Sequence, residues 1–288
     1  MMKKIIYLGL TLLLTTGLTL SSSCRTQKPP LPLDTKSSPT AQTTETNIQY
    51  IVKGQFRMIK VDNLGFIYLV KDNNEILKLD KNFNELHRYS INRLGKTKNI
   101  DVKNPQKTFV YFAEYATVVY LDNTLSEINR IDLEELDYWG IQGATVARDN
   151  NIWLLDYDNL RLIKITEAGQ IALSSNEQTE GLAGLRDEEP QLHAHGNQLY
   201  LRSDEGVSVY DEFGTYLIHH PIKNDLVQFA DNMIILSDNK IVKTYDLGIQ
   251  FKEATSTLTE LETKPVDFFL SRNKLYVVDE VGFYTLNL

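Results

Sequence analysis

The sequence is dominated by a short, strand-like segment that recurs six times. Each copy is apolar and is followed by a polar turn, as Phe66–Leu69 is followed by Asp72, Asn73 and Asn74. The intervals between equivalent positions are 43, 42, 47, 34 and 42 residues when these positions are taken as Tyr68, Tyr111, Trp153, Tyr200, Ile234 and Tyr276. A regular period of this length means that one supersecondary unit is repeated, and that neighbouring copies must pack together to bury their apolar faces.

The remainder of each unit predicts strands and tight turns. A third strand follows the anchor, as at Leu162–Ile165 and Val207–Tyr210, and it often closes with Asp and then Gly or Asn, as at Asp211 and Gly214. Alternating apolar positions bounded by such turns indicate antiparallel strands. About 42 residues suit four short strands, so we predict an all-β fold: a six-bladed β-propeller of four-stranded antiparallel blades. A β-sandwich with fortuitous regularity is the alternative.

The two ends of the repeat region predict how the ring closes. The last unit stops after three strands, at Val281–Leu288, whereas Ile48–Lys53 precedes the first complete unit and reads as a lone strand. We expect this amino-terminal strand to complete the last blade, because that pairing leaves no open sheet edge between the first and last blades.

The amino-terminal residues have the features of an export signal. Met1–Lys4 is positively charged, and Ile5–Leu20 is apolar and, at 16 residues, shorter than a membrane span. The following stretch, 25–46, is rich in Pro, Ser, Thr and Gln and has too few apolar residues to form a core. We therefore predict a signal peptide at 1–23, a lipidated cysteine with a flexible tether at 24–46, and a propeller domain at 47–288.

The segment that ends in Cys24, the only cysteine of the chain, resembles a bacterial lipobox. It departs from the common pattern because Ser21 stands where Leu is usual. The resemblance implies that Cys24 becomes the lipidated first residue of the mature protein, with a diacylglyceryl group and an amide-linked acyl chain such as palmitate, and several acyl chains give stable anchoring. We then expect a lipoprotein of the cell envelope, at the outer membrane and facing the periplasm. A plain secretory signal, with Cys24 incidental, is the alternative.

Composition excludes several classes of function. The formal net charge is −8 and no basic run occurs, so nucleic-acid binding is not expected. A single cysteine forms no internal disulfide and no cysteine-based metal site. The sequence also lacks a Gly-rich phosphate loop, a Gly-x-Ser-x-Gly elbow and a His-Glu-x-x-His motif, which disfavours the common nucleotide enzymes and hydrolases.

The cadence N-x-(L/I)-Y-(L/V), then D, then Y-D-x-x-G runs through residues 47–288. In this it resembles the six-bladed propellers of the NHL and YWTD type, in particular the small propeller lipoproteins of Gram-negative bacteria. The resemblance implies an architecture, expected to be monomeric. It does not select a function, because such propellers include lactonases, lyases, cyclotransferases and non-catalytic binding scaffolds.

Two pairs of side chains are candidates for a functional site. His193 and His195 alternate on the predicted innermost strand of blade four, so their imidazoles share a face and could bind a divalent metal ion in the central channel. Two polar residues near a strand end are the alternative interpretation. Tyr138 and Trp139 lie in a long inter-blade connection, where aromatic residues commonly anchor a partner. Packing between blades two and three is the alternative for this pair.

The tether and the missing catalytic motifs favour a non-catalytic role without a cofactor. We expect a membrane-anchored binding or scaffold module of the cell envelope that holds a protein, peptide or glycan. The alternative is a membrane-tethered propeller enzyme of the lactonase, lyase or cyclotransferase kind, with a divalent metal ion in the central channel.

Overall fold

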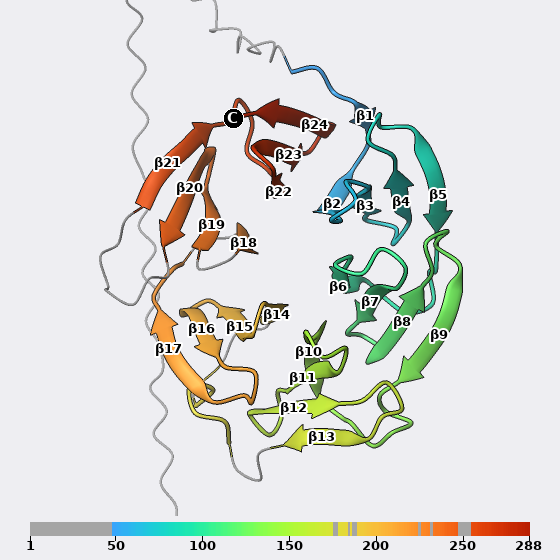
Figure 1. Cartoon of the computed structure of the whole chain (residues 1–288), viewed down its shortest axis with the longest axis vertical. Helices are drawn as coiled ribbons and strands as arrows, with labels where there is room; N and C mark the ends of the chain where they lie inside the picture. The colour runs from blue at the N-terminus through green and yellow to red at the C-terminus, as the bar shows by residue number, and fades with distance from the viewer. Residues whose placement is uncertain are drawn as a thin grey trace, which may run out of the picture. The chain divides into compact units, whose positions relative to one another are not determined.

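The computed structural model describes residues 48–174, 178–183, 185, 189–223, 226–230, 233–246 and 255–288. Six four-stranded antiparallel sheets follow one another around a central axis, coloured from blue to red along the chain in Figure 1. The prediction of an all-β, six-bladed propeller is confirmed. The predicted signal peptide, Cys24 and the tether lie outside the described residues, so the domain boundaries stay predictions.

Each of the first five blades uses four consecutive strands, counted from the axis outward (Figure 1). Blade one has β2 (Phe56–Val61), β3 (Ile67–Lys71), β4 (Ile76–Leu79) and β5 (Glu85–Tyr89). Blade two has β6 (Thr97–Asp101), β7 (Thr108–Phe112), β8 (Thr117–Leu121) and β9 (Glu127–Asp132). Blade three has β10 (Ile141–Val146), β11 (Ile152–Asp156), β12 (Arg161–Ile165) and β13 (Ile171–Ser174).

The later blades repeat this order. Blade four has β14 (Gln191–His195), β15 (Gln198–Ser203), β16 (Gly206–Tyr210) and β17 (Tyr216–His220). Blade five has β18 (Leu226–Ala230), β19 (Met233–Asp238), β20 (Ile241–Asp246) and β21 (Thr255–Glu260). Blade six has β22 (Asp267–Ser271), β23 (Lys274–Val278), β24 (Gly282–Asn287) and, as its outermost strand, β1 (Val52–Lys53).

The amino-terminal strand closes the ring, as the sequence predicts. β1 pairs antiparallel with β24, with Val52 opposite Phe283, and the amide of Ile51 donates to the backbone oxygen of Phe283 at 2.8 Å. The hydroxyl of Tyr50 donates to the buried carboxylate of Asp279 at 2.7 Å. All six sheets are therefore complete within residues 48–288, and we call residues 47–288 the propeller body.

The repeated anchor residues form the core between blades. Tyr68, Tyr111, Trp153 and Tyr200 lie on the second strand of their blades and are almost fully buried. A second strand is covered on both faces by neighbouring blades, so its residues are apolar without interruption rather than alternating. This double burial is the physical reason for the period seen in the sequence.

Lysine ammonium groups also join neighbouring blades. Lys78 on β4 is buried, its Nζ lies 5.2 Å from the ring centroid of Tyr68, and it donates to the backbone oxygen of Asn123 in blade two at 2.8 Å. Aromatic rings likewise lie under the ammonium groups of Lys107, Lys164 and Lys274. Because a ring face and a carbonyl replace the lost water, these charges are tolerated between blades.

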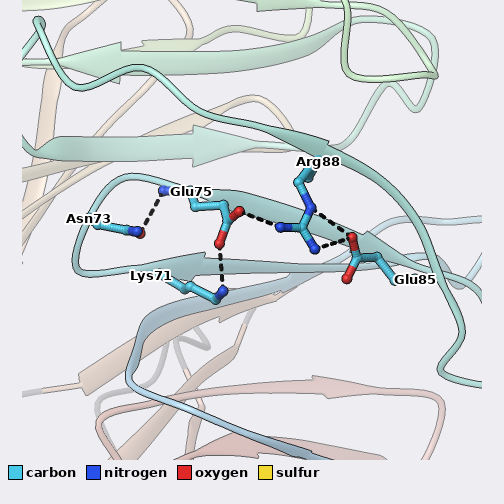
Figure 2. A network of polar contacts seen from close by, with 5 residues as sticks. All are labelled: Lys71, Asn73, Glu75, Glu85 and Arg88. Atoms are coloured by element: carbon cyan, nitrogen blue, oxygen red, sulfur yellow. Dashed lines mark hydrogen bonds and ion pairs between the residues drawn. The ribbon is translucent and has the colours of Figure 1, made fainter.

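A network of charges in blade one connects Lys71 on β3 with Glu75 and, through it, with Arg88 and Glu85 on the outer strand β5 (Figure 2). Glu75 accepts from Lys71 and from Arg88, and Arg88 also donates to Glu85. The hydrogen bond from Lys71 is the main cause that lowers the pKa of Glu75. The charges of Glu85 and Arg88 on the outer strand discourage edge-to-edge association more than they add stability. Among the described residues, no helix has the length and hydropathy needed to span a bilayer.

Candidate binding site at the channel mouth

The polarity of the blades places all inner strands in the same direction. β2, β6, β10, β14, β18 and β22 therefore begin on one face of the ring, which we call the entry face, and end on the other, the exit face. The entry face also bears the turns between second and third strands and the connections from one blade to the next. The exit face bears the remaining turns.

A cavity of about 610 Å³ lies at the entry face, and residues of all six inner strands line it. We call it the channel-mouth cavity. Its lining carries charges of both signs, together with the amides of Asn99, Gln142 and Gln191. The charged side chains are Arg57, Lys60, Lys96, Lys98, Glu114, Glu189 and Asp267.

Asp267 is largely buried in the cavity wall, with 18% of its side chain exposed. Its Oδ2 accepts from the backbone amide of Ile59 in blade one at 2.8 Å, and the Nζ of Lys60 lies 3.9 Å away. Burial raises the pKa of this carboxyl, and the charge of Lys60 opposes that effect. Asp267 thus joins blade six to blade one at the cavity wall.

Amide side chains make similar links between other inner strands. The Nδ2 of Asn99 donates to the backbone oxygen of Ala144 at 2.9 Å. Gln228 bonds both backbone groups of Leu270, donating at 3.0 Å and accepting at 2.6 Å. Because these bonds run from side chains to the backbone of the next blade, the cavity wall is preorganised rather than formed on binding.

Arg57 brings a partly buried guanidinium to the same wall. Its Nη2 donates to the backbone oxygen of Thr97 at 2.5 Å, whereas its buried Nε has no hydrogen-bond partner within the described ranges. Desolvation lowers the pKa of Arg57, with Asp72 and Glu189 opposing it. A guanidinium stays protonated in proteins, so this group adds a fixed positive charge to the cavity.

The structure separates the two histidines singled out in the sequence. His193 lines the channel-mouth cavity, and its ring centroid lies 5.2 Å from that of Phe229 in blade five. Burial, with the charges of Lys60, Lys103 and Arg202, lowers the pKa of His193 to about 3, so its imidazole is neutral at pH 7. His195 pairs with Gln198 at the far end of β14.

The metal hypothesis concerns His193 and His195. In the part of the chain that the structure describes, no group of three or more His, Cys, Asp or Glu side chains could hold a metal ion. Two residues of the neighbouring acidic run, Asp187 and Glu188, lie outside the described residues. Metal binding by the two histidines therefore stays a prediction, and the described residues supply no third ligand.

Tyr138 and Trp139 have different environments despite being adjacent. Tyr138 packs against the core between blades two and three, and its hydroxyl donates to the backbone oxygen of Gly169 at 2.9 Å. Trp139 is 58% exposed. Asp137 and Gly140, with φ of 64° and 67°, bend the chain on either side of the pair. Tyr138 is therefore a packing residue, whereas Trp139 is exposed to a partner at the surface.

A further exposed aromatic residue, absent from the sequence prediction, lies on the entry face. Tyr115 is 55% exposed and directly follows Glu114, which lines the cavity. Its turn is tied to the connection that bears Trp139, because the amide of Leu133 donates to the oxygen of Ala116 at 3.0 Å. Both exposed aromatic residues therefore belong to the face that bears the channel-mouth cavity.

No family model and no curated protein matches this sequence. Solved structures do match the fold. A streptogramin B lyase aligns with a TM-score of 0.52 and 12% identity, over 84% of this chain and 85% of that one. A catalytically inactive virginiamycin B lyase from Staphylococcus aureus, with quinupristin, aligns with a TM-score of 0.53 and 13% identity, over 78% and 77%.

The extracellular domain of another protein is similar to the same degree. It belongs to a hybrid two-component system of B. thetaiotaomicron and aligns with a TM-score of 0.52 and 13% identity. The match covers 81% of this chain but only 33% of that one. At such identities the comparisons establish the shared architecture, and this chain has the β-propeller fold of proteins with differing roles.

Proposed function

We propose that this protein is a lipid-anchored, non-catalytic binding module of the bacterial cell envelope, and that its entry face holds a segment of a protein or peptide. The anchor rests on the signal-like amino terminus and on Cys24. A lyase and the extracellular domain of a two-component system share the fold, so the fold does not decide between binding and catalysis, and the proposal rests on the site.

The observation that carries the proposal is the composition of the entry face. A preorganised cavity of about 610 Å³ is within the range of ligand sites. The same face bears Tyr115 and Trp139, and exposed aromatic residues of this kind commonly carry much of the energy of an interface. The cavity offers ammonium, guanidinium, carboxylate and amide groups together, which match the charges and backbone of a peptide better than the hydroxyls of a neutral glycan.

Photo-crosslinking in whole cells tests this surface. The full-length chain is made with p-benzoylphenylalanine in place of Trp139 or of Tyr115, and with the same substitution at Phe213 as the matched control. Phe213 is also an exposed aromatic residue, at 64%, but lies in the β16–β17 turn on the exit face. We expect a discrete adduct from positions 139 and 115 and none from 213.

The nature of the adduct separates the possible partners. A protease-sensitive adduct that mass spectrometry assigns to one polypeptide supports the proposal, whereas a protease-resistant glycan adduct would reassign the ligand. Equal adducts from all three positions, or none, would contradict binding on the entry face. Labelling with a radioactive fatty acid, lost on Cys24→Ser, tests the anchor separately.

A propeller enzyme with a divalent metal ion is the second candidate. It is favoured by one observation, the neutral imidazole of His193 within the cavity, because neutral imidazole is the form that binds metals. Metal analysis of the purified propeller body and of its His193→Ala and His195→Ala variants is the test. Stoichiometric metal that disappears on substitution would favour the enzyme, and a metal-free protein would remove its basis.

A further inference from the structure

A second cavity opens on the exit face, at the opposite ends of the inner strands. It has a volume of about 410 Å³ and lies among the turns of blades two, three and four. We call it the exit-face cavity. None of its lining residues lines the channel-mouth cavity, so what binds there is independent of the function proposed above.

The inner wall of the exit-face cavity is apolar. Phe109 is fully buried and meets Tyr120 edge to face, with the ring centroids 5.7 Å apart. Val146, Ala147 and Ala194 complete the wall, and the small size of the two alanines leaves the space open. A ligand with an apolar body gains free energy here, because contact with Val146, Ala147 and Ala194 removes apolar surface from water.

Two of the cations at this cavity are already neutralised. The Nζ of Lys103 lies 2.7 Å from a carboxylate oxygen of Asp101 and also donates to the backbone oxygen of Ala194 at 2.8 Å. Lys107 lies over the ring of Tyr120 and forms an ion pair with Glu167. These groups link blades two, three and four and are committed to the wall.

Arg148 differs from these lysines. Its Nη1 donates to the neutral side-chain oxygen of Asn197 at 2.7 Å, and no described carboxylate forms an ion pair with it. An exposed arginine is common on protein surfaces, but Arg148 lines two adjoining cavities. It lines the exit-face cavity and an adjoining one of about 270 Å³, which share Ala147, Ala194 and Gly196.

We propose that the exit-face cavity binds a small organic anion with an apolar body. Its carboxylate or sulfonate pairs with the guanidinium of Arg148, and its apolar part lies against Val146, Ala147 and Ala194. A guanidinium fork matches such oxyanions in a bidentate manner. The volume of about 410 Å³ accommodates a molecule of two or three fused or linked rings.

A matched pair of fluorescent probes tests the anion requirement. 8-Anilinonaphthalene-1-sulfonate and N-phenyl-1-naphthylamine share one apolar body, and only the first carries a charge. Titrated against the propeller body, the sulfonate should bind at one site at least about tenfold more tightly than the neutral probe, since one charge-assisted bond is at stake. Equal affinities, or no binding, would overturn the proposal.

Two substitutions place the charge. Arg148→Gln should weaken sulfonate binding about tenfold and leave binding of the neutral probe unchanged. Arg130→Gln is the matched control, because Arg130 lies on outer strand β9 and pairs with Glu127, away from the cavity. Unchanged sulfonate affinity in Arg148→Gln, or an equal loss in Arg130→Gln, would overturn the assignment. Neither result bears on the entry face.

Discussion

The ammonium group of Lys164 lies 4.9 Å from the ring centroid of Trp153 and donates to the backbone oxygen of Glu212, in the next blade, at 3.1 Å. Lys164 and Trp153 are directly opposite each other on β12 and β11. The same nitrogen is 2.9 Å from Asp149, and the lysine side chain is only 9% exposed. A ring, a carbonyl and a carboxylate thus replace water around this charge and join blade three to blade four.

Replacing this lysine should weaken the blade interface. Lys164→Met keeps most of the apolar stem but removes a charge-assisted hydrogen bond and a cation–π contact, so we expect a loss of about 2–3 kcal/mol in the free energy of unfolding. Urea denaturation of the propeller body measures it. Lys243→Met is the control, because Lys243 is also on a third strand but pairs with the exposed Asp238. We expect less than about 0.5 kcal/mol there, and equal losses would contradict the role of Lys164.

Closure of the ring depends on a glycine. A Cβ on Gly282 would lie 2.3 Å from the backbone oxygen of Val52, which is on the closing strand β1. Gly282→Ala should therefore displace β1, lower the free energy of unfolding by about 1–3 kcal/mol and speed amide exchange in residues 48–54. Gly196→Ala is the control, since a Cβ there meets nothing within 4 Å.

The control variant Gly196→Ala separates backbone strain from displacement of β1. Gly196 has a φ of 59°, so alanine there costs about 1–2 kcal/mol of conformational strain. In Gly196→Ala, the amide exchange rates of residues 48–54, measured by mass spectrometry, should equal those of the unmodified protein. Similar protection of that segment in Gly282→Ala and the unmodified protein would contradict the closure argument.

The fold could be predicted from the sequence because the residues that determine it are local and repeated. Trp153 and Tyr200 occupy the same place in successive blades, and burial on both sides keeps such positions apolar. The turns are local as well: Oδ1 of Asp211 accepts from the backbone amides of Phe213 and Thr215 at 2.9 and 2.8 Å. A period of about 42 residues and Asp-initiated turns therefore predict six blades.

The site was harder to predict from the sequence because it depends on contacts between blades that are distant in the chain. Lys60 and Asp267 approach to 3.9 Å although they come from the first and the last units of the repeat. Alternation predicts that side chains share a face of a strand, but not how deep along the channel each one lies. For this reason His193 reaches the channel-mouth cavity while His195 does not line it. Tyr115 carried no signal beyond being an aromatic residue in a turn.

His193 should make the protein sensitive to acid. Its folded-state pKa, about 3, is below the ordinary value of 6.5, so below pH 6.5 the unfolded chain binds a proton that the folded chain does not. Stability attributable to this group is present above about pH 6.5 and is lost as the pH falls toward 3. His193→Gln removes the effect, so between pH 7 and pH 5 the unmodified protein should lose about 2 kcal/mol more than the variant.

Urea denaturation at the two pH values measures this difference. Nuclear magnetic resonance gives an independent check, because the imidazole resonances of His193 should not shift between pH 7 and pH 5 in the folded protein. A His193 resonance that titrates near pH 6.5, or the same acid sensitivity in both proteins, would show that the imidazole is not desolvated in the channel.

Truncation to alanine should destabilise the protein at Tyr138 and have little effect at the adjacent Trp139. Tyr138 packs against the core between blades two and three, and its hydroxyl donates to the backbone oxygen of Gly169 in blade three, so Tyr138→Ala should cost about 2–3 kcal/mol of folding free energy. Trp139 is exposed on the entry face, so Trp139→Ala should change stability by less than about 0.5 kcal/mol. Thermal and urea denaturation of both variants measure this. If Trp139→Ala destabilised the protein as much as Tyr138→Ala, Trp139 would be a packing residue, and its use as the aromatic contact of a partner would lose its physical basis.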